Sequence, residues 1–444
     1  VTLGSYAFAG NHYLYELVLP AGIKYMDEGV FSDCGRLAEV TFPTTTDGEL
    51  AIPSYAFYGC YSLRRIEIPS YVTLIGSHAF DGLYLTEVTI ADGDKNLVVG
   101  SFAFADNKDL TTINLPSRVT EVCSYAFFGS GVTEVNFAAD GNSEVTVSEY
   151  AFAKTSIENI VIPARVTLLG SGVFAYTNNL VSVVMESKDD GERDIPASTF
   201  EESSLIYLTV NGKVKNICEF AFRNAVGIKN IELTAADEFS IGEAAFEKSG
   251  IESVTIKNSP SFIAIETRAF YLTLSLTGFT ATAGRFSIGN FAFARSGIKN
   301  LTFNAVGTES SFVGTGIAAQ SENLTEIKFN DASGSLICED GILYAVTANG
   351  RELVQYPAGK KGAVLILAET VVKVRDYAFG GNGYLTTITV PQADRTVEFT
   401  ENAFAEANDI TVFVDESKVE DYDTNVNVES IQSGFDGLSL KSVG

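Results

Sequence analysis

The chain has 444 residues, of which 46% are hydrophobic, and its 56 acidic and 30 basic side chains give a net charge of −26. Nucleic-acid binding draws most of its affinity from clustered Lys and Arg, so this charge excludes nucleic acid as a partner and disfavours adsorption to anionic lipid. No stretch approaches the roughly 18 apolar residues that span a bilayer, so we expect no direct membrane insertion in this portion.

From its first residues onward, the chain is a series of repeats that carry the pattern I-G-x-x-A-F or a variant of it. The repeats number seventeen and return about every 24 residues. That period lies in the range of leucine-rich solenoids and excludes ankyrin, tetratricopeptide and propeller repeats. In chain order, the anchor residues are Phe8, Phe31, Phe57, Phe80, Phe104, Phe127, Phe152, Phe174, Phe200, Phe222, Phe246, Phe270, Phe293, Ile317, Ile342, Phe379 and Phe404.

Each repeat also contains a block L-x-x-[LIV]-x-[LIF], as at residues 37–42, 63–68 and 110–115. Apolar residues alternate there with Thr, Glu, Asn and Lys, which is the period of a half-buried strand. Such strands bury their apolar faces by stacking in parallel, so we predict one continuous core. The β-branched return segments, such as residues 72–76, predict a second short strand and then a single helical turn that carries A-F.

Residues 72–80 (VTLIGSHAF) and 119–127 (VTEVCSYAF) resemble the BspA-like, or Treponema pallidum type, leucine-rich repeat family. The resemblance implies a right-handed leucine-rich-repeat solenoid, or horseshoe, grouped with the α/β horseshoes, with a parallel concave sheet and very little helix. Residues 340–344 (DGILY) and 353–360 (LVQYPAGK) are similar to the divergent longer repeat of these proteins. The family's F-x-x-C occurs only at Phe31 to Cys34 and at Phe57 to Cys60.

The domain organisation follows from the extent of the repeats. We predict a single solenoid over residues 1–414, with a divergent longer repeat at 331–378, and a C-terminal cap at 415–444. The prediction for the cap allows one short helix but does not require it. Because the chain begins in the middle of a repeat, we expect it to be an excised portion of a longer precursor.

Residues capable of chemistry are few. His12 and His78 are the two histidines, and no protease, P-loop or dinucleotide motif is present, so we predict no enzyme, catalytic residue or cofactor. The five cysteines read as small buried residues. Cys34 and Cys60 fall at matching positions of consecutive repeats, where reduced thiols are favoured and a disulfide is the alternative. Acidic turns interrupt the longer repeats at residues 46–49, 92–96, 140–144 and 188–194. Residues 92–96 (DGDKN) resemble the opening of a calcium loop but lack its later Gly and Glu, so we predict no metal site.

The outward side chains of the predicted strands remain as carriers of function. Glu39, Arg65 and Glu87 should stack as a self-compensating row of charges. Repeats seven to nine break this polar pattern with an apolar patch, and a second break falls at the divergent repeat that begins at Asp340. The predicted partner-binding residues of the patch are Val161, Val181, Val184, Ile206 and Tyr207.

Members of the family that the chain resembles are exported or surface-anchored bacterial proteins, some of them adhesive. The resemblance therefore implies an extracellular or cell-surface binding module, with host or bacterial surface proteins as partners. A glycan-binding or structural surface component is the alternative. Sugar binding would require aromatic platforms on the concave face, where only Tyr15 and Tyr207 are candidates and Trp is absent from the chain, so protein binding is the leading hypothesis.

Overall fold

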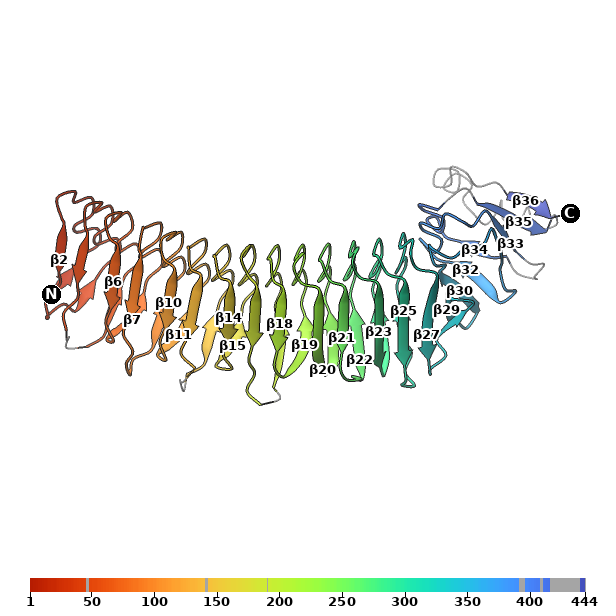
Figure 1. The fold of residues 1–444 in the computed structure, drawn as a ribbon, viewed down its shortest axis with the longest axis horizontal. Coiled ribbons are helices and arrows are strands. Elements are labelled where there is room, and N and C mark those ends of the chain that lie inside the picture. The colour runs from red at the N-terminus through yellow and green to blue at the C-terminus, as the bar shows by residue number, and fades with distance from the viewer. Residues whose placement is uncertain are drawn as a thin grey trace. The chain divides into compact units, whose positions relative to one another are not determined.

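The computed structural model describes residues 1–44, 48–139, 143–189, 191–390, 396–407, 410–415 and 440–443. Two compact parts divide the chain. The N-terminal part comprises Val1–Lys213 and Ala221–Ile228, and the C-terminal part comprises Val214–Phe220 and Lys229–Gly444. Both consist of short strands coiled in successive repeats, and the described residues contain no helix (Figure 1). The predicted leucine-rich-repeat solenoid is therefore confirmed.

In the N-terminal part, the L-x-x-[LIV]-x-[LIF] blocks form one layer of strands, the front strands. The surface made by their outward side chains is called the front face. Neighbouring front strands pair in parallel, for example β6 (Arg65–Ile68) with β8 (Glu87–Ile90), with Ile66 opposite Val88 and Ile68 opposite Ile90. All four of these side chains are buried, so alternation places the apolar half of each strand in the core as predicted. The front strands are β2 (Glu16–Val18), β4 (Glu39–Thr41), β6 (Arg65–Ile68), β8 (Glu87–Ile90), β10 (Thr112–Leu115), β12 (Glu134–Phe137), β14 (Asn159–Ile162), β16 (Ser182–Met185) and β18 (Tyr207–Val210).

The return strands precede the A-F loops. The odd-numbered strands from β5 to β15 form a six-stranded parallel sheet in the order β15-β13-β11-β9-β7-β5, and β1 pairs with β3. The return strands of this part are β1 (Thr2–Leu3), β3 (Tyr25–Met26), β5 (Leu50–Ile52), β7 (Val72–Ile75), β9 (Leu97–Val99), β11 (Val119–Val122), β13 (Val145–Val147), β15 (Val166–Leu169) and β17 (Glu192–Ile195). Strand β19 (Lys213–Ile217) begins where this part ends.

The A-F segments form a third layer, the loop layer, in which anchor rings stack from repeat to repeat. The rings of Phe57, Phe80 and Phe104 lie 5.2 and 5.3 Å apart and nearly parallel. Each loop also bonds to the next, as when the Phe57 N–H donates to Ala79 O at 3.0 Å. The predicted helical turn is absent because the residue two positions before the anchor is left-handed, with φ of 58° at Tyr55, for example. A left-handed residue cannot continue a right-handed helix.

The C-terminal part repeats the arrangement. Strand β20 is long enough to serve both strand layers, because its first half pairs with β21 and its second half with β22. The front strands of the C-terminal part are β20 (Asn230–Ile241), β21 (Ser253–Ile256), β23 (Gly278–Ala283), β25 (Asn300–Ala305), β27 (Glu326–Asp331), β31 (Val364–Ile366), β33 (Thr387–Thr389), β35 (Thr411–Asp415) and β36 (Leu440–Val443). Its return strands are β22 (Phe262–Ile265), β24 (Arg285–Ile288), β26 (Phe312–Val313), β32 (Val371–Val374) and β34 (Glu398–Phe399).

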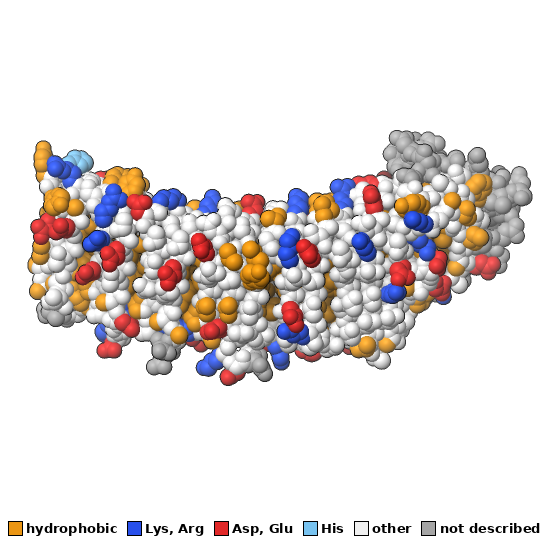
Figure 2. Space-filling model, in the orientation of Figure 1, with side chains coloured by type: hydrophobic (Ala, Val, Ile, Leu, Met, Phe, Trp, Pro, Cys, Tyr) orange, Lys and Arg blue, Asp and Glu red, His pale blue; other side chains and the backbone are white. Residues whose placement is uncertain are grey.

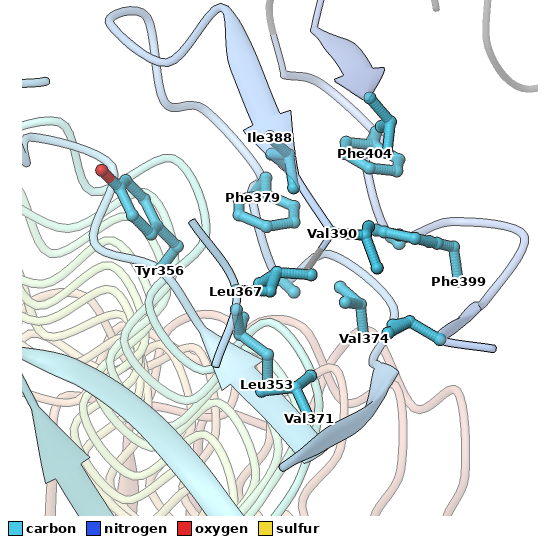
Figure 3. Close-up of a cluster of buried hydrophobic side chains, with 14 of the residues drawn as sticks. Leu353, Tyr356, Leu367, Val371, Val374, Phe379, Ile388, Val390, Phe399 and Phe404 are labelled. Carbon is cyan, nitrogen blue, oxygen red and sulfur yellow. The ribbon is translucent and has the colours of Figure 1, made fainter. Parts of the chain in front are cut away.

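The divergent repeat is an antiparallel meander of β28 (Leu336–Glu339), β29 (Ile342–Thr347) and β30 (Gly350–Gln355). The prediction that Ile342 is the anchor of this repeat is wrong, because Ile342 begins a hairpin strand opposite Glu339. The aromatic position belongs to Tyr356, which is buried 5.6 Å from the ring of Phe379 and donates its N–H to Ala378 O. Figure 3 shows Phe379 between Tyr356 and Phe404 in this core.

The anchor of the preceding repeat also differs from the prediction by one residue. The Phe293 N–H donates to Ile317 O, whereas in regular repeats this acceptor is the residue before the anchor. Ala318 therefore holds the anchor position, and Ile317 stands in the place of the usual small residue. Both side chains are buried. A large residue before a small one replaces the usual Ala-Phe order and keeps the layer filled.

Two arginines, the buried Arg118 and the half-buried Arg165, donate to carbonyls of earlier repeats. The Arg118 guanidinium donates to Ala91 O at 2.6 Å and Lys95 O at 3.4 Å at the turn of residues 92–96, and to Val72 O at 2.6 Å and Pro69 O at 3.0 Å in the repeat before it. Burial lowers the pKa of Arg118. Arg165 reaches Val119 O in the same way, at 2.8 Å. The acidic turns at residues 46–49, 140–144 and 188–194 lie partly outside the described residues.

The end of the chain continues the front layer, since β36 pairs in parallel with β35. The predicted cap at 415–444, with its optional helix, falls largely on residues 416–439, which lie outside the described residues. The extent of a single solenoid over residues 1–414 stays a prediction.

Candidate functional site

The five predicted patch residues come from β14, β16, β18 and the segments that lead into them. Val161 and Val184 are register partners in one outward row of the front face, which continues to Thr209. Tyr207 belongs to the next row, opposite Ser182 and two residues from Thr209. Val161 is 51% exposed and Tyr207 is 66% exposed, whereas Val184 is half-buried. Val184 and Tyr207 are thus diagonal neighbours across two paired strands.

Val181 and Ile206 lie where these strands begin. The Val181 carbonyl accepts the N–H groups of both Ile206, at 3.0 Å, and Tyr207, at 2.9 Å, so the two segments meet at one point. Ile206 is exposed and Val181 is half-buried. The structure therefore brings together all five residues named from the sequence. Figure 2 shows hydrophobic side chains gathered on this face over β16 and β18.

The surroundings of the patch are polar and shallow. A depression of about 410 Å³ runs over β12, β14 and β16 and includes Val161 and Val184. Ser182 Oγ donates to Asn159 Oδ1 at 2.8 Å, so the row that contains Tyr207 continues as a polar row over β16 and β14. Glu134 and Glu186 border the depression. An apolar centre with a polar rim is the usual composition of a protein contact surface.

The predicted row of charges is present but incomplete. Arg65 and Glu87 are register partners, with Arg65 Nε 3.5 Å from Glu87 Oε2, and both side chains are largely exposed. Glu39 pairs in register with Glu16, so like charges face each other at that end of the row. An exposed pair of this kind contributes little to folding.

The loop layer contains a second aromatic row that was not predicted from the sequence. The residues two positions before five consecutive anchors stack at 4.7–5.2 Å with nearly parallel rings. All five are half-buried, and the [Y/F/H]-A-F pattern was readable in the sequence. They are Tyr55, His78, Phe102, Tyr125 and Tyr150. Because each ring covers the face of the next, the row presents ring edges to solvent and offers no platform for a sugar.

His78 sits inside this row with a partner of its own. Its Nδ1 lies 2.8 Å from Asp81 Oδ2, and its ring stacks between Tyr55 and Phe102. Burial raises the pKa of Asp81, and the hydrogen bond with His78 opposes that shift. These contacts give the histidine a structural place in the loop layer.

The cysteines and the acidic turn also have structural partners. Cys34 and Cys60 are buried as predicted, whereas Cys123, Cys218 and Cys338 are half-buried, and no disulfide joins any of the five. The Cys34 and Cys60 thiols donate to the carbonyls of Phe8 and Phe31 at 3.1 and 3.2 Å. Asp92 Oδ1 accepts the Gly93 N–H and the Ser117 hydroxyl, both at 3.0 Å. Burial raises the pKa of Asp92, but these two donors together with the Arg118 N–H and its positive charge outweigh burial and lower it. Among the described residues, no three His, Cys, Asp or Glu side chains are placed to hold a metal.

Known structures resemble the chain at low sequence identity. A leucine-rich repeat protein from Bacteroides ovatus is 17% identical over 100% of this chain and 88% of its own, with a TM-score of 0.46. The pneumococcal vaccine antigen PcpA is 16% identical over 99% and 92%, with a TM-score of 0.44. A leucine rich cell surface protein from Faecalibacterium prausnitzii is 18% identical over 90% and 87%, with a TM-score of 0.33.

The search of curated proteins finds no match. The described part of the chain holds no helix with the length and hydropathy that a membrane span needs. The sequence model of the BspA type leucine rich repeat region matches six stretches, residues 1–97, 47–143, 145–264, 193–312, 239–336 and 363–434. These matches cover most of the sequence and carry the repeats described above. The chain therefore belongs to the BspA-type leucine-rich repeat family.

Proposed function

We propose that the chain is a non-enzymatic binding module of a bacterial cell surface or of a secreted protein, and that it binds a protein partner through the front face. The observation that carries the proposal is the break in the polar outward pattern at β14, β16 and β18. There Val161, Val184 and Tyr207 expose apolar surface in adjoining rows of a hydrogen-bonded sheet. Exposed apolar patches with polar rims mark interaction sites.

Rigidity supports this assignment. The patch residues stand on strands that are paired in register, so little ordering is required when a partner binds. Tyr207 supplies the large amphipathic side chain that dominates many protein interfaces. The front face is less suited to sugars, because its exposed tyrosines lie far apart: Tyr15 directly precedes β2, whereas Tyr207 begins β18, nearly two hundred residues further along the chain. The acidic charge of the chain favours a partner with a basic surface around its apolar contact.

The test is a binding screen of the purified chain against host matrix proteins and bacterial surface proteins. Val184→Glu and Tyr207→Ala should each weaken binding at least about tenfold, because they place a charge in, or remove the anchor from, the contact. Thr89→Glu, on the same outward position of β8, and Tyr15→Ala, with a similarly exposed ring, are the matched controls. Binding that both patch variants retain would contradict the proposal.

A further inference from the structure

The loop layer of the C-terminal part contains an open groove of about 1140 Å³ that was not predicted from the sequence. Leu274, Arg295, Asn323, Tyr384 and Glu406 are among its lining residues and belong to five different repeats. We propose that this groove is a binding site for a neutral oligosaccharide. It is distinct from the front-face patch, so the two proposals succeed or fail separately.

The groove arises because the divergent repeat lacks a full A-F loop. The Gln320 N–H donates to Gly380 O at 2.9 Å, so the loop of one repeat bonds directly to a loop sixty residues further along. What the divergent repeat contributes is a short strap at Ala358 and Gly359, held by the Gly359 N–H to Leu324 O at 2.8 Å. The small residues Gly297, Ala358 and Gly381 line the groove, and no long side chain at these positions fills it.

The rim is held rigidly. Asn382 is fully buried, and its Nδ2 donates to the carbonyls of Pro357, Ala358 and Lys360 at 3.0–3.1 Å. Its Oδ1 accepts the N–H groups of Tyr384 and Leu385 at 3.0 and 2.8 Å. This single amide fixes the strap and the turn that carries Tyr384. The backbone at Tyr384 is therefore in place before any ligand arrives, and the Tyr384 side chain is 47% exposed.

The backbone of the groove has little left to offer a ligand. The N–H groups of Arg295, Gln320 and Gly381 already donate to the carbonyls of Ala319, Gly380 and Glu406. An extended peptide is usually recognised through free backbone groups of a strand edge or through apolar pockets. Recognition here must come from side chains, which favours a ligand whose own polar groups are hydroxyls.

The side chains present suit such a ligand. Glu322 and Asn323 are exposed in the groove and carry planar groups with two donors or acceptors side by side, which match pairs of neighbouring sugar hydroxyls. The Tyr384 ring supplies an apolar face for the C–H side of a sugar ring. An elongated groove that crosses several repeats fits a chain of sugars better than a single one.

Charge selects for a neutral ligand. Of the described residues that line the groove, only Arg295 is cationic, and it is already engaged. Its Nη2 lies 3.3 Å from both carboxylate oxygens of Glu406, and its Nε donates to Gln320 Oε1. Glu322 adds a further negative charge to the lining. An acidic sugar would meet carboxylates with no free cation to oppose them.

The experiment is an array of neutral and uronic-acid-containing oligosaccharides, followed by titration calorimetry of the purified chain with the strongest neutral binder. Tyr384→Ala should weaken binding about tenfold, and Asn323→Ala should also weaken it. Tyr84→Ala is the control, because Tyr84 is exposed to the same 47% and stands at the same position of its repeat, before Leu-Thr. Val184→Glu should leave sugar binding unchanged.

Thermal melts of each variant establish that it is folded. An array on which no neutral oligosaccharide binds would overturn the proposal, and so would binding confined to acidic sugars. Equal affinity of wild type, Tyr384→Ala and Asn323→Ala would place any sugar elsewhere on the chain and overturn the site. Peptide binding that Tyr384→Ala abolishes, without sugar binding, would assign the groove to another ligand class.

Discussion

The loop layer is continuous in the N-terminal part and interrupted in the C-terminal part. Between Tyr55 and Tyr150, every repeat places a ring face to face with the next at 4.7–5.2 Å. Around the divergent repeat, the layer passes directly from Gln320 to Gly380 and leaves Tyr384 exposed beside a groove. In the regular repeats, the ring faces stack on one another and the backbone N–H groups of each loop bond to the next loop, so few groups are left for a ligand. Where the repeat is interrupted, side chains are left exposed to a ligand, while the layers on either side of the interruption remain intact.

The largest effect is expected from breaking the continuous anchor stack. Phe127→Ala removes a fully buried ring that stacks on Phe104 and Phe152, and should lower the free energy of unfolding by about 3–5 kcal/mol. The double variant Ala126→Ile/Phe127→Ala copies the order of Ile317 and Ala318 and should recover part of that loss. Urea unfolding measures both. A double variant no more stable than Phe127→Ala would show that the Ile317 arrangement depends on its neighbours in the divergent region.

A smaller loss is expected where an arginine ties a longer turn to the N-terminal part. Arg118→Met preserves the apolar stem but leaves the carbonyls of Pro69, Val72 and Ala91 without this donor, so the free energy of unfolding should fall by about 2–3 kcal/mol. The exposed Arg36→Met is the control and should change stability by less than about 0.5 kcal/mol. Equal small effects of the two variants would mean that the turn of residues 92–96 is held by other contacts.

The buried thiols predict a loss of stability in alkali. Burial raises the pKa of Cys60 to about 12 from an ordinary value of 9.0, so the unfolded thiol ionises first as the pH rises. The stabilisation is fully present below pH 9 and is lost as the pH rises toward 12. For Cys60 alone the loss between pH 9 and pH 10 is about 1 kcal/mol. Denaturant unfolding of wild type and Cys60→Ala over this range measures it, and parallel pH profiles would contradict it.

The regular part of the fold could be predicted from the sequence, because one residue pattern recurs often enough to fix its own register. Alternation in each L-x-x-[LIV]-x-[LIF] block placed Ile66 and Val88 in the core and Arg65 and Glu87 outside, as the structure has them. The same logic brought Val161, Val184 and Tyr207 to neighbouring positions on one face. The contacts of that patch with a partner stay a prediction.

The divergent region could not be predicted in the same way. Spacing and apolar character selected Ile317 and Ile342 as anchors, but these properties do not distinguish Ile317 from Ala318 or a solenoid turn from a hairpin. The register there is set by hydrogen bonds between residues distant in sequence, such as Gln320 with Gly380. The groove depends on the same pairing, so Tyr384 gave no signal beyond its proximity to the repeat that breaks the pattern.

The smallest effect is expected on the front face, away from the patch. Arg65→Ala removes a largely exposed ion pair with Glu87 and should cost about 0.3–0.5 kcal/mol in low salt and less at high ionic strength. Comparison with Glu87→Gln and with the double variant isolates the pair. A coupling above about 1 kcal/mol, or one insensitive to salt, would mean that the outward rows help to hold the solenoid together. With a small coupling, the outward positions contribute little to folding, so loss of binding in Val184→Glu or Tyr207→Ala reports on the contact surface itself.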